Sequence, residues 1–129
     1  MKEEESVEEY EVSLQILKII ETLIEQIDSS VEALVTETKI LEYLANRIMP
    51  NYVVKHKVID DNKYVGSDVL AYILSNSSQA QLKFHSICGM EILVESIRPY
   101  LSRSPASSDE KEYLGNLFDC LNILLINRT

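Results

Sequence analysis

Few residues in this chain have the types and spacing that catalysis requires. His56 lies between two lysines and His85 follows Phe84, and neither has a Cys, Asp or Glu at a spacing typical of a metal site or a nucleophile–base pair. Three glycines are too few for a phosphate-binding loop. Cys88 and Cys120 lack metal-ligand spacing and are expected to be buried free thiols. We therefore expect no enzymatic activity, no cofactor and no metal.

Carboxylates are the abundant functional group. Asp and Glu number 21 against 12 Lys and Arg, which gives a formal net charge of −9. Binding to phosphate backbones needs clustered cations, and Lys55-His56-Lys57 with Lys63 is the single local basic cluster. We therefore expect no direct contact with nucleic acid. The acidity favours basic partners, or it serves only to keep the domain soluble.

Helices are the elements that must position these carboxylates. Apolar residues recur at helical spacing, and three Gly and three Pro leave little room for the turns of a sandwich or barrel. Gly89 is predicted to end a helix in the left-handed conformation, and Pro99 to give the following helix a kinked or ragged end. No run of 18 apolar residues could span a membrane. The expected helices cover about 8–27, 30–37, 38–49, 61–75, 79–87, 90–101 and 108–125.

An internal repeat relates these helices. One apolar pattern recurs at offsets of 50 and then 51 residues, in Ile19-Ile20…Leu23-Ile24, Val69-Leu70…Ile73-Leu74 and Cys120-Leu121…Leu124-Leu125. Long helices that alternate with pairs of short ones are typical of armadillo-type units, which must stack to bury their apolar faces. We predict an all-α, armadillo-like α-solenoid, a right-handed superhelical stack of about two and a half units over 9–129. A flexible acidic segment at 1–8 precedes it, and uncapped repeat ends could self-associate.

The long helices of such a stack line its concave groove. Carboxylates on parallel helices about 10 Å apart suit the Lys and Arg side chains of an extended peptide. The alternative is that these side chains are simply the solvated face. The polar stripe of the three long helices supplies the candidate groove residues Glu21, Glu25, Asp68, Ser75, Asp119 and Asn122.

Several strings resemble a known family. They are Asn62-Lys63-Tyr64 leading into Ser67-Asp68-Val69-Leu70, then Gly89-Met90-Glu91-Ile92-Leu93, and Asp109-Glu110-Lys111-Glu112-Tyr113 running into Asn116-Leu117-Phe118-Asp119. On these strings the chain resembles the central repeats of the beta-catenin-like armadillo family associated with the spliceosome.

That resemblance implies a nuclear, non-enzymatic scaffold of the pre-mRNA splicing machinery, attached to the NineTeen complex. It also implies binding to basic, nuclear-localisation-type segments of partners among the splicing-complex subunits. The alternative is an import-type armadillo cargo receptor or another armadillo adaptor. Import receptors use arrays of Trp and Asn along the groove, and the absence of Trp from this chain counts against that class.

Overall fold

The fold is all-helical throughout the part of the chain that the structure describes. The computed structural model describes residues 7–27, 29–49, 61–102, 104–105 and 107–126, and no strand occurs among them. Its helices are α1 (Val7–Gln26), α2 (Ser29–Glu37), α3 (Ile40–Ile48), α4 (Asp61–Asn76), α5 (Ser78–Ser86), α6 (Gly89–Ile97) and α7 (Ser108–Ile126), with the 3-10 turn η1 (Arg98–Tyr100) after α6. The predicted all-α class is confirmed. None of these helices is long and apolar enough to cross a membrane.

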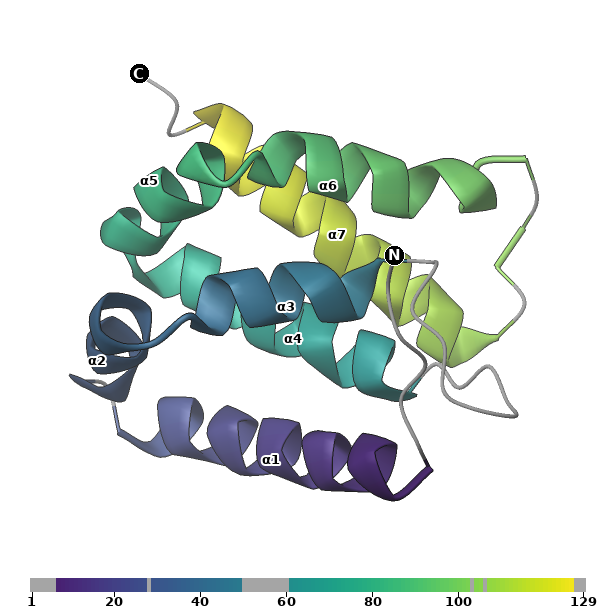
Figure 1. The fold of residues 1–129 in the computed structure, drawn as a ribbon. Helices are drawn as coiled ribbons and strands as arrows, with labels where there is room; N and C mark the ends of the chain where they lie inside the picture. Colours follow the sequence, from purple (N-terminus) through teal and green to yellow (C-terminus); the bar gives the residue numbers. More distant parts are fainter. Residues whose placement is uncertain (1–6, 28, 50–60, 103, 106, 127–129) are drawn as a thin grey trace.

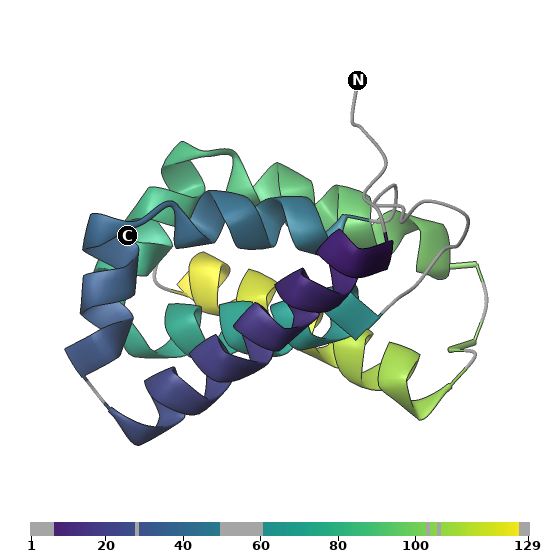
Figure 2. The same cartoon turned by 60° about the horizontal axis from the view of Figure 1, so that its bottom comes forward.

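The helices form two layers. The long helices α1, α4 and α7 have 20, 16 and 19 residues, whereas α2, α3, α5 and α6 have nine each. Helix α4 lies between α1 and α7 and packs against both (Figure 1). Figure 2 shows the three long helices on one side, with α3 and α6 on the other. This is the predicted arrangement of three long helices separated by two short pairs.

The core is densest around α4, because that helix has a neighbour on either side. Its Val69, Leu70, Ile73 and Leu74 are all fully buried, and Leu17 and Ile24 of α1 are buried as well. Each such side chain contributes about 1.5–3 kcal/mol when it leaves water. The solvated stripe of α4 is narrow as a result, and it carries the polar residues discussed below.

The short helices α2 and α5 of successive units form hydrogen bonds with each other at their ends. Ser77 is the N-cap of α5, and its hydroxyl accepts a hydrogen bond from the Ala80 N–H at 3.0 Å. The same hydroxyl donates to the Glu32 carboxylate of α2. Lys83 Nζ of α5 donates to the Val35 carbonyl in the last turn of α2, at 2.9 Å. Groups that a helix leaves unsatisfied at its ends are thus partly satisfied by the neighbouring unit.

Gly89 does not end a helix in the left-handed conformation, so that prediction is wrong. The left-handed residue at this junction is Cys88, with φ 65°, and Gly89 is the first residue of α6. A Cβ at Gly89 would lie 2.2 Å from the Phe84 ring, so glycine is needed for close packing and not for backbone conformation. Both cysteines are free, but Cys88 is exposed, which contradicts the expectation that it is buried; Cys120 is buried as predicted.

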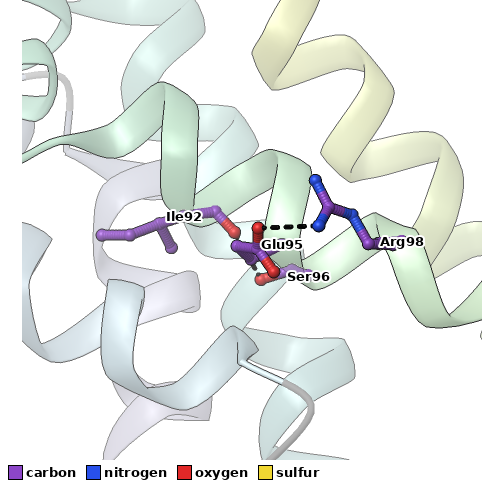
Figure 3. A network of polar contacts seen from close by, with 4 residues as sticks. All are labelled: Ile92, Glu95, Ser96 and Arg98. Atoms are coloured by element: carbon purple, nitrogen blue, oxygen red, sulfur yellow. Dashed lines mark hydrogen bonds and ion pairs between the residues drawn. The ribbon is translucent and has the colours of Figure 1, made fainter.

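Helix α6 has the irregular end that was predicted from Pro99. The regular helix stops at Ile97 and the chain continues through the 3-10 turn, because proline has no N–H to offer a preceding carbonyl. Figure 3 shows the polar contacts of this end. Arg98 and Glu95 form an exposed ion pair at 3.3 Å, and the buried Ser96 hydroxyl donates to the Ile92 carbonyl at 2.8 Å.

Lys63 belongs to a buried aromatic cluster. It is 6% exposed, and its Nζ donates to the Tyr100 hydroxyl at 2.8 Å. The fully buried Tyr113 packs edge-on against Tyr100 and donates its hydroxyl hydrogen to the Ile48 carbonyl at 2.6 Å. Lys63 therefore serves the core and is not part of a surface basic cluster.

The other members of the predicted basic cluster, Lys55, His56 and Lys57, lie outside the described residues. Residues 1–6 also lie outside them, and α1 begins at Val7. A flexible segment at 1–8 stays a prediction.

Candidate peptide-binding groove

Four of the six predicted groove residues line one hollow between α4 and α7. The hollow has a volume of about 310 Å³ and is otherwise lined by Ala71, Tyr72, Asn76 and Ile123. Asp68 of α4 and Asp119 of α7 line the same hollow because they are equivalent positions in the repeat, at the offset of 51 residues. The four predicted residues that line the hollow are Asp68, Ser75, Asp119 and Asn122.

Hydrogen bonds set the chemistry of this hollow. Asn116 Nδ2 of α7 donates to Asp68 Oδ1 at 2.5 Å and to Ser67 Oγ at 3.1 Å, which orients the Asp68 carboxylate. The Ser75 hydroxyl donates to the Ala71 carbonyl of its own helix at 2.7 Å. Ser75 therefore presents oxygen lone pairs to the hollow. A carboxylate with flanking acceptors suits a cation with several N–H donors.

A second hollow adjoins the first and shares Asp68 with it. It has a volume of about 350 Å³ and lies where α1, α4 and α7 meet. Asp109 and Glu112 of α7 bring two further carboxylates to it, and Lys18 of α1 brings a cation. Its remaining lining residues are Leu14, Tyr64, Val65 and Tyr113.

Asp109 and Glu112 were not predicted as groove residues. A signal for them was present, since residues 109, 112, 116 and 119 are spaced by three, four and three along α7. Side chains at that spacing lie on one face of a helix. The first two turns of α7 therefore extend the acidic strip that contains Asp119.

The carboxylates of the three long helices act on one another. The negative charge of Asp68, together with a hydrogen bond between the two side chains, raises the pKa of Glu112. Partial burial, followed by the charge of Asp68, raises the pKa of Glu21 on α1. Glu25 and Glu112 add to that shift in Glu21. These carboxylates repel each other, and a bound cation would relieve the repulsion.

The other two predicted groove residues, Glu21 and Glu25, line neither hollow. In the repeat, the position of Asp68 and Asp119 is occupied on α1 by Lys18. The acidic strip is therefore continuous along α4 and α7 and is interrupted on α1. Within the described residues, no three His, Cys, Asp or Glu side chains form a group that could hold a metal ion. His85 lies half-buried on α5.

The two-layer stack of short helix pairs on long helices defines an armadillo-like α-solenoid, as predicted. The family described as "Catenin-beta-like, Arm-motif containing nuclear" matches residues 1–129. The chain belongs to this family. The Arm motif in this description agrees with the armadillo-like stack of helices. The resemblance inferred from the sequence is thereby confirmed.

Individual relatives agree with the family. The chain is 34% identical over 107 residues to the Beta-catenin-like protein 1 homolog of Schizosaccharomyces pombe, covering 82% of this chain and 18% of that protein. It is 29% identical over 62 residues to Beta-catenin-like protein 1 of Rattus norvegicus and of Mus musculus, covering 48% of this chain and 11% of each relative. The chain thus spans less than a fifth of the length of these relatives. No solved structure matches it.

Proposed function

We propose that this chain is a protein-binding segment whose acidic groove holds basic, nuclear-localisation-type peptides. The observation that carries the proposal is the convergence of Asp68, Glu112 and Asp119 on two adjoining hollows that share Asp68. Two acidic hollows side by side suit two basic side chains of one extended peptide. Groove carboxylates that repel one another favour Lys and Arg over neutral ligands.

The wider role rests on the family. Its description as nuclear supports a nuclear location for this chain, and the resemblance to spliceosome-associated proteins supports a scaffold role in pre-mRNA splicing, next to the NineTeen complex. Affinity capture from nuclear extract tests this role. Recovery of splicing-complex subunits supports it, whereas recovery of import carriers with diverse cargo would favour an import-type receptor and overturn it.

Peptide titration tests the groove directly. A fluorescent Lys/Arg-rich peptide should bind the chain, and a peptide with the same sequence but Gln at each basic position should not. We expect Asp119→Asn and Glu112→Gln each to weaken binding about tenfold, since a hydrogen bond to a charged group contributes about 1.5 kcal/mol or more. Added salt should weaken binding further, because exposed charges are screened.

Glu91→Gln is the matched control, because Glu91 is an exposed carboxylate on α6 and its substitution removes the same charge away from the groove. This variant should bind as the parent does. Equal losses for Glu91→Gln and Asp119→Asn would mean that net charge alone attracts the peptide. Unchanged affinity in Asp119→Asn and Glu112→Gln together would refute the groove.

A further inference from the structure

The two hollows of the groove follow one another along the line where α4 and α7 meet. On α4, residues of the stretch 64–68 line the second hollow and residues of 68–76 line the first. On α7 the corresponding stretches are 109–113 and 119–123. Both helices therefore pass the two hollows in the same order. We call this path between α4 and α7 the seam.

A peptide that crossed the long helices would meet a cation. The position of Asp68 and Asp119 is occupied on α1 by the exposed Lys18, which also lines the second hollow. A basic side chain placed beside Lys18 would face a like charge. In contrast, the charged side chains that α4 and α7 contribute to the two hollows are all carboxylates. Charge therefore favours a peptide that runs along the seam.

Asp68 is held at the point where the two hollows meet. It lines both of them, and Asn116 Nδ2 of α7 donates to its carboxylate. Asn116 also donates to Ser67, but its Oδ1 accepts no hydrogen bond from the described residues. In the sequence of α7, Asn116 lies between Glu112 and Asp119. The middle of the seam thus has a fixed carboxylate and an open carbonyl oxygen, which suits a backbone N–H of a peptide.

Helix geometry gives the distance between the two hollows. Glu112 lines the second hollow and Asp119 lines the first, and they lie seven residues apart on one face of α7. Seven residues of helix span about 10.5 Å. In a polyproline II segment, side chains three residues apart share one face at about 9.3 Å. In a β-strand, side chains on one face are about 6.6 Å or about 13.2 Å apart, so polyproline II is the closer match.

We infer that the bound peptide lies along the seam in a polyproline II-like conformation and presents two basic residues three positions apart, one to each hollow. This inference rests on the proposed function, because it assigns the spacing and the path of the same basic ligand. Asp68 contributes charge to both hollows, and Asn116 accepts a backbone N–H from the residues between the two basic ones. The sequence pattern that this groove selects is basic-x-x-basic.

A peptide series with fixed length and charge tests the spacing. Each peptide carries two Arg residues that are separated by one, two, three or four neutral residues, and its affinity is measured by fluorescence titration. The peptide with two intervening residues should bind about tenfold more tightly than those with one or three, because only it engages both hollows at once. Glu112→Gln and Asp119→Asn each weaken one hollow, so each should abolish this preference. Glu91→Gln, away from the groove, should keep it.

Spin-labelled peptides test the path. With a nitroxide at one end of the peptide, the strongest broadening of backbone amide signals should lie around Asp109. With the nitroxide at the other end, it should lie around Asn122. A peptide that crosses the helices would, with one of these labels, broaden the signals of α1 around Glu21 most strongly, and this result would overturn the path along the seam.

The spacing series separates this inference from the proposed function. Peptides that bind equally well at every spacing, or most tightly at another spacing, would overturn the inference and leave the basic groove intact. Failure of every basic peptide to bind would refute the proposed function, and this inference with it.

Discussion

Glycine-to-alanine substitution at position 89 tests the packing argument for the α5–α6 junction. The added Cβ would lie 2.2, 2.5 and 2.6 Å from three atoms of the Phe84 ring. Phe84 is fully buried, so its ring cannot move aside without disturbing the core. Overpacking of this kind costs about 1–3 kcal/mol, and we expect the upper part of that range. The melting temperature should fall by roughly 5–10 °C.

The same substitution at Gly115 is the matched control. Apart from the neighbouring backbone of α7, no atom lies within 4 Å of a Cβ placed there. Alanine favours a helix interior over glycine by about 1 kcal/mol, so Gly115→Ala should stabilise the chain. Thermal and urea melts followed by circular dichroism measure both variants.

A double-mutant cycle assigns the cause at position 89. Phe84→Leu removes the ring, so it should lessen the cost of Gly89→Ala, although it leaves a cavity of its own. If Gly89→Ala is as stable as the parent, the close packing of Phe84 on residue 89 is refuted. If the two substitutions are simply additive, the ring is not the source of the loss.

Two further predictions concern ionisable groups. Burial, followed by the charge of Asp119, raises the pKa of Cys120 to about 12, so only Cys88 should react with iodoacetamide in the native chain. Mass spectrometry should show one label natively and two in urea, and two native labels would contradict the buried thiol. The raised pKa of Glu112 means that its protonated form stabilises the fold below its ordinary value of 4.5, and that this contribution is lost as pH rises through the raised value. Glu112→Gln should therefore increase the free energy of unfolding at neutral pH and reduce the gain on acidification. Urea melts at several pH values check this, and a destabilised Glu112→Gln at neutral pH would show that the carboxylate is needed structurally.

The sequence predicts the fold well because the same apolar pattern occurs three times, once in each long helix. One apolar pattern in three long helices places α1, α4 and α7 before any coordinates are known. Contacts between residues far apart in the chain are harder to predict from the sequence. Lys63 was assigned to a local basic cluster because its partner Tyr100 is 37 residues away in the sequence. Gly89 looked like a helix terminator because only the structure shows where the Phe84 ring lies.

In the groove, too, some residues were predicted from the sequence and others were not. Asp68 and Asp119 were predicted together because the repeat makes them equivalent, and the structure places them in one hollow. Glu112 is equivalent to Asp61 and Glu11 at the offsets of 51 and 50 residues, but these positions lie outside the polar stripe from which the groove residues were predicted. Its position depends on how the first turn of α7 packs near α1 and α4. Periodicity identifies equivalent positions but does not identify residues that meet only where helices converge.

The hydrogen bonds between α2 and α5 have a consequence for how the chain folds. A helix of nine residues is too short to be stable alone in water. The last turn of α2 nevertheless has its Val35 carbonyl satisfied by Lys83, and Glu32 holds the Ser77 cap of α5. Neither short helix can therefore complete its ends before the other has formed. The two should gain protection from hydrogen exchange together, so that the smallest folding unit of this solenoid crosses the boundary between neighbouring repeats.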